Sequence, residues 1–351
     1  MSLRAGHKPA NPNAECLEIR FARYSVYPGT QVRSSTPLGM RIIWQETGLR
    51  REIQILKQQF KNTLRRLGYE IHRVSPHGQE SQKTRLPSVT VNPIWPLPRD
   101  KNGQSEQQIR EEFAKYQNWH YAYEFEGGPS FSLCYKEGQP KEGDPLVFDS
   151  RRALQRFHHF MPYVVESQKG SLQGKRVLDI ACNSGFWSMQ CALLGAQVVG
   201  FDARPELIEQ ANLIKRIVGA SNVEFKVLDF WDMSPQLLGG TFDVVLSLGI
   251  LYHLPRPVEA LRLSKLMSRD YILLDTEVYP SPDSVVQLRW EEPGSVRSAV
   301  RSGIVEAPSK SGIEMILKEI GAAESFEIPL RTSDMPPDYR DQRRASWLVK
   351  V

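Results

Sequence analysis

The sequence predicts an α/β fold for residues 171–351, with a parallel β-sheet covered by helices on both faces. From residue 175 onward, short apolar runs alternate with segments of helical periodicity. Strands buried on both faces are continuous apolar runs, so this alternation is typical of a parallel sheet between two layers of helices. A small or acidic residue follows successive runs, at the strand ends where doubly wound sheets bind ligands. The predicted fold class is therefore a Rossmann-like α/β domain, preceded by an N-terminal α+β extension.

The individual elements follow from the same pattern. Five apolar runs are typical of strands, and the segments between them are long enough for helices. The expected strands are residues 176–181, 197–202, 223–229, 242–249 and 271–277, and the expected helices are residues 185–195, 205–218 and 258–267. A further strand is expected in the last segment, ASWLVKV.

Residues 1–110 form the expected N-terminal extension. Residues 1–40 are rich in Pro, Gly and Ser and are expected to be irregular. Apolar residues spaced three or four apart predict a helix over residues 49–67, with a basic opposite face. Five prolines that follow this helix indicate an extended connector. The basic face suits RNA or another acidic surface, although a solvated helix face is the simpler interpretation.

Residues 111–170 join the extension to the sheet domain. An aromatic, alternating segment around a Gly-Gly pair predicts a β-hairpin, and residues 150–169 are expected to be helical. The hairpin carries Trp119, His120 and Tyr121. These side chains are candidates for a cover over the active site, with a place in the hydrophobic core as the alternative.

Composition and charge narrow the classes of function. The chain of 351 residues has a net charge of +5 and 40% hydrophobic residues, which is typical of a globular protein rather than of a dedicated nucleic-acid binder. Its four cysteines form no CxxC pair, so neither a disulfide framework nor a metal site is expected. No run has the apolar character of a secretory leader or the about 18 residues of a membrane span. We expect a cytoplasmic protein with no membrane partner, and the oligomeric state stays open.

Candidate ligand-binding residues lie at three successive strand ends. The first expected strand leads into a loop of small residues from Asp179 to Gly185, where a ligand can approach the backbone closely. The second ends in Asp202, at the distance along the chain where a carboxylate binds the hydroxyls of a ribose. The third ends in Asp229. Together these positions predict a nucleoside-containing ligand.

The loop after the first strand also separates two classes of ligand. Dinucleotide-binding sheets have the G-x-G-x-x-G fingerprint here, which places a pyrophosphate at the helix N-terminus. The corresponding residues are Ala181, Asn183 and Gly185, followed by the bulky Trp187. A polar Asn and a bulky Trp suit a ligand without phosphate, such as an adenosyl amino acid.

These segments resemble a known family. The stretch GKRVLDIACNSGFWSMQCALLGAQVVGFD is similar to motif I of class I S-adenosylmethionine-dependent methyltransferases. It is most similar to the bacterial tRNA wobble-uridine carboxymethyltransferases and their relatives that methylate small molecules or glycans, which FDVVLSLGILYHLPRP and LLDTEVYP also resemble. The likeness covers residues 115–351, with Ala181 where the family usually has Gly. It implies that S-adenosyl-L-methionine is the cofactor.

The resemblance also implies a role for each strand-end residue. Asp202 would hold the ribose hydroxyls, and Asp229 would face the adenine amine with Phe230 against the ring. Asp179 and Gly185 would shape the amino-acid end of the cofactor site. The expected cofactor-binding residues are Asp179, Ala181, Asn183, Gly185, Asp202, Asp229, Phe230 and, on the opposite wall, Leu248 and Gly249.

Tyr252 and His253 are the candidate catalytic residues, because they follow the fourth strand, where a methyl acceptor would approach the cofactor. Histidine titrates near neutral pH and is the commonest general base. Tyr252 would contribute to the acceptor pocket. Methyl transfer also proceeds by positioning alone, so a structural role for His253 is the alternative.

Three functions are compatible with this site. We expect methylation of a hydroxyl on a small molecule or glycan. Modification of the tRNA wobble uridine is the alternative, favoured by the family likeness and the basic helix but not by the modest net charge. In that family an arginine near the position of Arg344, which lies beside Arg340 and Arg343, holds the extra carboxylate of a carboxylated cofactor. A non-catalytic protein that kept the fold is the third.

Overall fold

The computed structural model describes residues 16–20, 39–43, 86–116, 119–131, 145–292, 299–300, 303–330 and 335–351. The chain divides into two units, Met1–Arg85 and Leu86–Val351. In the first unit, β1 (Cys16–Arg20) pairs antiparallel with β2 (Gly39–Ile43). Residues 1–40, expected to be irregular, therefore contain strand β1 and the start of β2. A strand of five residues is not visible in the composition of a long Pro- and Gly-rich segment. The helix predicted over residues 49–67 lies outside the described residues.

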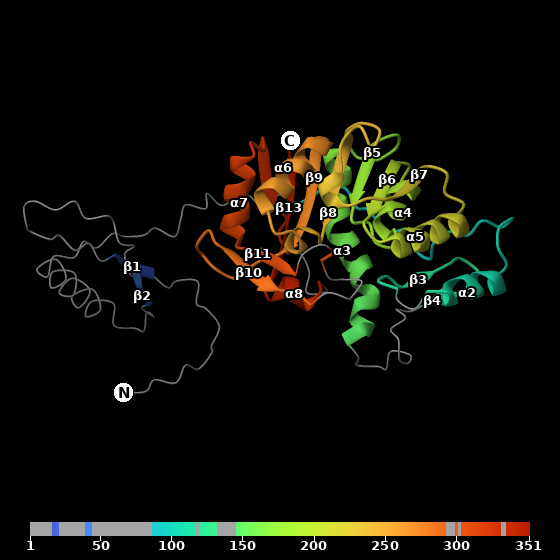
Figure 1. The fold of residues 1–351 in the computed structure, drawn as a ribbon, viewed down its shortest axis with the longest axis horizontal. Coiled ribbons are helices and arrows are strands. Elements are labelled where there is room, and N and C mark those ends of the chain that lie inside the picture. Colours follow the sequence, from blue (N-terminus) through green and yellow to red (C-terminus); the bar gives the residue numbers. More distant parts are fainter. Residues whose placement is uncertain are drawn as a thin grey trace, which may run out of the picture. The chain divides into compact units, whose positions relative to one another are not determined.

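The second unit contains a seven-stranded sheet with the order β12-β13-β9-β8-β5-β6-β7 (Figure 1). Its strands are β5 (Arg176–Ile180), β6 (Gln197–Asp202), β7 (Val223–Val227), β8 (Phe242–Leu248), β9 (Ser268–Glu277), β12 (Glu324–Glu327) and β13 (Arg344–Lys350). Strands β5 to β9 pair in parallel, whereas β13 is antiparallel to both β9 and β12. The predicted parallel sheet is confirmed, and the predicted last strand extends it in the opposite direction.

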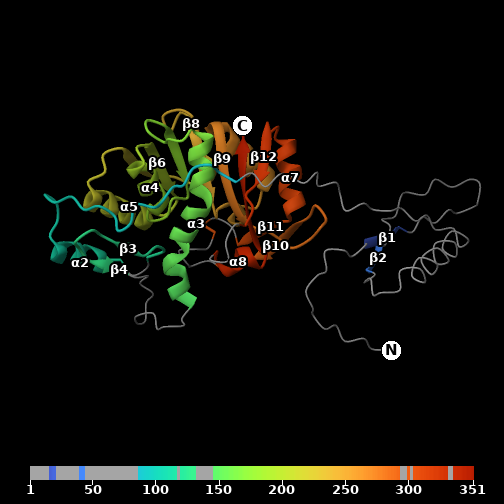
Figure 2. The same ribbon diagram turned by 180° about the vertical axis from the view of Figure 1, so that it is seen from behind.

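Helices cover both faces of this sheet (Figures 1 and 2). They are α3 (Pro145–Ser167), α4 (Phe186–Leu193), α5 (Pro205–Val218), α6 (Pro257–Met267) and α7 (Lys310–Glu319). Successive strand residues point to opposite faces: Val244 and Leu246 pack in the core cluster with α3, α4 and α5, whereas Val245 packs in the cluster with α6 and α7. A strand between two cores must therefore be apolar on both sides. Its continuous apolar run is the signal by which the sequence predicts it.

The segment before the sheet also packs against it. Helix α2 (Glu106–Ala114) begins at a capping box formed by Ser105 and Gln108, and β3 (Tyr123–Glu124) and β4 (Ser130–Phe131) confirm the predicted hairpin. In the proline-rich segment, Leu97 is fully buried, and the Ile94 amide donates to Gln190 Oε1 of α4 at 2.9 Å. Residues 86–110 therefore belong to the same unit as the sheet.

Strands β10 (Val286–Trp290) and β11 (Ile304–Pro308) form a separate antiparallel ribbon between β9 and α7. It is not among the strands predicted from the sequence, because β10 is a short alternating run (VQLRW) without the continuous apolar character of the sheet strands, and it is exposed along its whole length. The ribbon packs against the short helix η2 (Leu251–His253). Within the described parts of the chain, no helix is both long enough and apolar enough to cross a membrane.

Candidate active site

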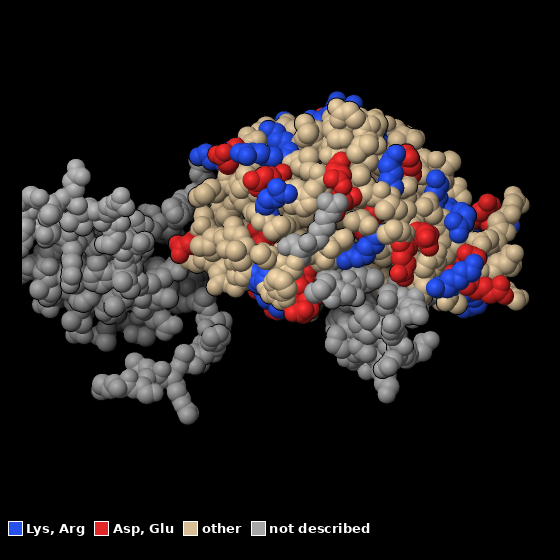
Figure 3. Space-filling model, in the orientation of Figure 1, with Lys and Arg blue, Asp and Glu red and all other residues tan. Residues whose placement is uncertain are grey.

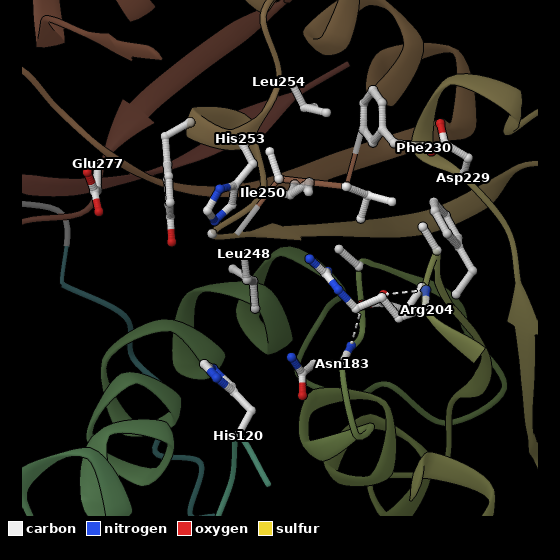
Figure 4. Close-up of a pocket in the computed structure, with 18 of the residues that line it drawn as sticks. His120, Asn183, Arg204, Asp229, Phe230, Leu248, Ile250, His253, Leu254 and Glu277 are labelled. Carbon is white, nitrogen blue, oxygen red and sulfur yellow. Dashed lines mark hydrogen bonds between the residues drawn. The ribbon is translucent and has the colours of Figure 1, made fainter. Parts of the chain in front are cut away.

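A cavity of about 710 Å³ lies at the carboxyl ends of the parallel strands (Figure 4). Each of the five parallel strands contributes lining residues. They include Ala181 and Asn183 after β5, Asp202 and Arg204 at and after the end of β6, Asp229 and Phe230 after β7, Leu248, Gly249, Ile250, Tyr252, His253 and Leu254 at and after the end of β8, and Glu277 of β9. In Figure 4 Asp229 and Phe230 lie at one end of the cavity and Glu277 at the other, with His253 between them. The cavity is large enough for a drug-sized ligand, since such pockets measure about 300–1,000 Å³.

The loop between β5 and α4 is tightly wound. Ala181 and Asn183 have φ values of 53° and 54°, in the left-handed region that non-glycine residues rarely adopt. Gly185 follows at φ 85°, and a Cβ there would lie 2.8 Å from Phe225 Cζ. Ala181 and Asn183 line the cavity, but Gly185 does not. The glycine is therefore required by the packing beneath the loop rather than by direct approach to the cavity.

Asp202 lies at the end of β6 and is 4% exposed. Its Oδ2 accepts a hydrogen bond from the Asn183 amide at 3.2 Å, and its Oδ1 accepts one from the Arg204 amide at 3.0 Å. Burial raises the pKa of Asp202, and these backbone donors oppose the shift. An ionised carboxylate has about four acceptor sites, so these two donors do not use all of the acceptor capacity of Asp202.

Asp179 supports this region from below. Its side chain is 2% exposed, and its Oδ2 accepts a hydrogen bond from Ser188 Oγ at 2.6 Å. Burial raises the pKa of Asp179 to about 7, and the charge of Asp202 adds to the effect. Asp179 does not line the cavity. Its hydrogen bond to Ser188 joins the end of β5 to helix α4, on either side of the loop that carries Ala181 and Asn183.

Asp229, Phe230, Leu248 and Gly249 line the cavity as the sequence analysis expects. Asp229 Oδ1 accepts a hydrogen bond from the Trp231 amide at 2.9 Å and caps the short helix η1 (Phe230–Asp232). Across the cavity, the Gly249 amide donates to the Asp275 carbonyl at 2.8 Å. These contacts hold the two walls in a defined position.

Tyr252 and His253 lie in η2 and line the part of the cavity nearest the β10–β11 ribbon. His253 Nδ1 is 3.0 Å from Glu291 Oε2. Burial lowers the pKa of His253, and Glu291 opposes this shift. The Tyr252 ring lies 5.3 Å from the guanidinium carbon of Arg344. A base candidate and an aromatic side chain therefore face the same end of the cavity.

A buried cluster around Asp275 lies at this end, and of its residues only Arg344 is a candidate from the sequence. Asp275 is fully buried; its Oδ1 accepts from Arg156 and Arg344, each at 2.7 Å, and its Oδ2 accepts from Tyr339 and Ser346. Burial alone would raise the pKa of Asp275, but the two arginines hold it below its usual range. The available signal was an Asp within the apolar strand LLDTE, since a buried carboxylate requires partners.

The predicted cover is present in part. His120 and Tyr121 line the cavity, and Figure 4 shows His120 across from His253. Trp119 is instead 2% exposed and stacks on Phe113, with ring centroids 4.2 Å apart. Its side chain is part of the core. Among the described residues, no group of three or more His, Cys, Asp or Glu side chains could hold a metal ion.

Comparison with known proteins identifies the domain. The fold is similar to that of the N-terminal domain of EvdMO1, solved with SAH (S-adenosylhomocysteine) bound, with a TM-score of 0.55 and 23% identity over 72% of this chain and 98% of that one. A family model for a methyltransferase domain matches residues 171–297. The chain contains a class I S-adenosylmethionine-dependent methyltransferase domain. The predicted methyltransferase family is thereby confirmed.

Relatives of this methyltransferase domain have different acceptors. A tRNA U34 carboxymethyltransferase from Alcanivorax borkumensis is 27% identical over 181 residues, which are 51% of this chain and 53% of that protein. A ubiquinone biosynthesis O-methyltransferase from Xanthomonas campestris is 36% identical over 92 residues, which are 26% of this chain and 38% of that protein. The chain thus spans about half the length, or less, of the curated relatives it matches.

Proposed function

We propose that this protein transfers the methyl group of S-adenosylmethionine to a hydroxyl group of a small molecule or glycan. One observation carries the proposal: a single cavity has Asp202 and Asp229 at successive strand ends and a histidine side chain, His253, beyond them. The two acids suit a nucleoside, and the histidine suits removal of a proton from an acceptor. A cavity with both features can hold the methyl donor and the methyl acceptor side by side.

The cofactor residues have separate roles in this proposal. Asp202 accepts hydrogen bonds from the ribose hydroxyls, and Asp229 accepts one from the adenine amine, with Phe230 against the ring. Ala181 and Asn183 border the amino-acid end, while Leu248 and Gly249 form the opposite wall. Asp179 and Gly185 act from beneath, by holding the loop in shape. Bound S-adenosylmethionine supplies a methyl group that is already activated for transfer.

Carboxymethylation of a tRNA wobble uridine is the second candidate. It is favoured by the carboxymethyltransferase relatives and by Arg344, which lines the cavity beside Tyr252. Against it, Arg344 Nε and Nη2 both contact Asp275 Oδ1, at 2.7 and 2.6 Å. In Figure 3 the Lys and Arg side chains of the described residues on that face are interspersed with Asp and Glu rather than gathered into a patch. A tRNA-binding surface usually concentrates positive charge.

Calorimetric titration with S-adenosylmethionine and SAH, before and after nuclease treatment, tests the cofactor. Micromolar binding of both supports the proposal, and no binding of either would favour a non-catalytic protein with the same fold. The acceptor class is tested with radiolabelled methyl donor and a panel of monosaccharides, including D-fucose, catechols and bulk tRNA. Labelling of tRNA alone, with a salt dependence typical of phosphate contacts, would replace the proposed acceptor by the second candidate.

A further inference from the structure

We propose that Glu291 is the positioning residue for His253, so that the two side chains form a general-base pair for the acceptor hydroxyl. This inference rests on the proposed function and extends it to a residue outside the methyltransferase sheet. Glu291 follows directly after strand β10 of the ribbon, 38 residues along the chain from His253. It lines the same cavity as His253.

The contact between them is held from two sides. Glu291 Oε2 lies 3.0 Å from His253 Nδ1 and also accepts a hydrogen bond from the Ala299 amide at 2.7 Å. A backbone donor fixes the carboxylate independently of the histidine. The ribbon packs against η2, which carries His253. Glu291 is therefore placed before an acceptor binds, as a positioning group requires.

This geometry determines which ring nitrogen of His253 is available. A carboxylate accepts hydrogen bonds and does not donate them, so Nδ1 of the neutral ring must carry the proton. Nε2 then has the free electron pair. The same arrangement, with the second nitrogen held by a carboxylate, sets the tautomer of histidine bases in general.

The charged groups around His253 shift its pKa in opposite directions. Glu291 and Glu277 of β9 favour the protonated ring, whereas Arg204 and burial disfavour it. Burial is the largest effect, and the pKa of His253 lies below its usual value. The ring is thus neutral at neutral pH and able to accept a proton. Glu291 stabilises the imidazolium that forms when it does so.

The proposed step transfers one methyl group and one proton. The proton of the acceptor hydroxyl passes to Nε2 of His253 while the acceptor oxygen forms a bond to the methyl carbon. The bond between that carbon and sulfur breaks, and sulfur keeps the electron pair. The products are the methyl ether, neutral S-adenosylhomocysteine and protonated His253, which returns its proton to solvent.

Nuclear magnetic resonance of protein labelled with ¹⁵N-histidine tests the pair without any acceptor. The chain has seven histidines, and His253→Asn assigns the signal. We expect wild-type His253 to be protonated at Nδ1, and Glu291→Gln to lower its pKa and disturb the tautomer. Glu292→Gln is the matched control, because Glu292 Oε1 accepts from Trp290 Nε1 at 2.8 Å. An unchanged His253 titration in Glu291→Gln would overturn the proposal.

Kinetics with any acceptor that is labelled in the panel give a second test. A positioned base contributes about 10²–10⁴-fold, so we expect Glu291→Gln to lower kcat by about 10- to 100-fold. SAH affinity should stay unchanged. Glu291→Asp keeps the charge and should restore part of the rate, which also covers the case in which the Gln variant folds poorly. A normal kcat in Glu291→Gln would refute the general-base pair but not the proposed methyltransferase function. Absence of SAH binding in the wild type would refute the proposed function itself.

Discussion

Arg344 Nε donates to Asp275 Oδ1 at 2.7 Å, and both side chains are almost completely buried at the end of the cavity. The contact joins β13 to β9, which pair antiparallel in the sheet with Arg344 opposite Glu277. Because Arg156 of α3 shares the same carboxylate oxygen, one aspartate compensates two cations. Asp275 therefore connects two arginines that line the cavity to strand β9 of the sheet.

We predict that Asp275→Asn destabilises the protein by about 3–5 kcal/mol, because breaking a buried ion pair leaves its partners without compensation. Asp341→Asn is the control, since Asp341 pairs with Arg343 on the surface and such pairs contribute about 0–1 kcal/mol. Urea unfolding measures both. The folded-state pKa of Asp275 lies below its usual value, so its stabilisation is complete above about pH 4 and is lost as the pH falls through the folded pKa. Equal losses in the two variants would refute the role of the cluster.

Asp202→Ala should weaken binding of SAH by about tenfold or more, which corresponds to about 1.4 kcal/mol. The substitution removes a buried acceptor that also accepts from Asn183 and Arg204. Calorimetry measures the affinity. Glu224→Ala serves as the control because Glu224, on the neighbouring strand, is exposed and pairs only with Lys226 among the contacts of the described residues. Unchanged affinity in Asp202→Ala would mean that the nucleoside binds elsewhere.

Asp179 should make the protein less stable as the pH rises. Burial raises its pKa to about 7 in the folded state, against about 3.9 in the unfolded chain. The stability present below pH 4 is therefore lost as the pH rises to about 7, by about 1.4 kcal/mol per pH unit at most. Asp179→Asn keeps an acceptor for Ser188 and should be more stable than wild type at pH 8 but not at pH 4. A difference in urea midpoint that does not vary with pH would contradict this expectation.

Gly185→Ala should destabilise the loop by about 1–3 kcal/mol, as expected for a left-handed non-glycine residue under strain. The new Cβ would also lie 2.8 Å from Phe225 Cζ and 3.1 Å from Ala211 Cβ. Gly127→Ala separates the two effects, because Gly127 has φ 58° but no atom within 4 Å of the added Cβ. Thermal unfolding should show a larger loss for Gly185→Ala, and similar losses would exclude the steric contribution.

The sheet could be predicted because its physical cause is local. Strand β8 must fill two cores, so most of its residues are apolar. Helix α5 begins at Pro205 and ends before Gly219, and this Pro and Gly are start and stop signals that can be read in the sequence. The residues of the cavity that follow strand ends could be predicted for the same reason. Asp202 and Asp229 are where parallel strands stop, and Figure 4 shows Asp229 and Asn183 bordering one space.

The remaining site residues could not be predicted because their contacts are long-range. Arg156 lies 119 residues from Asp275, and Arg344 lies 69 residues from it. Glu291 follows β10, a short exposed strand whose alternating sequence gives no sign that the next residue enters the cavity. No window of the sequence contains both partners of these contacts, and only the folded chain brings them together.

The β10–β11 ribbon contributes no strand to the seven-stranded sheet, yet it carries the carboxylate that contacts His253. Under the proposed function, a segment outside the sheet therefore contributes to the acceptor end of the cavity, beside Tyr252 and His253 of η2. For an engineer, the interval between β9 and α7 is the place to exchange when a different acceptor is wanted, with the donor site left as it is.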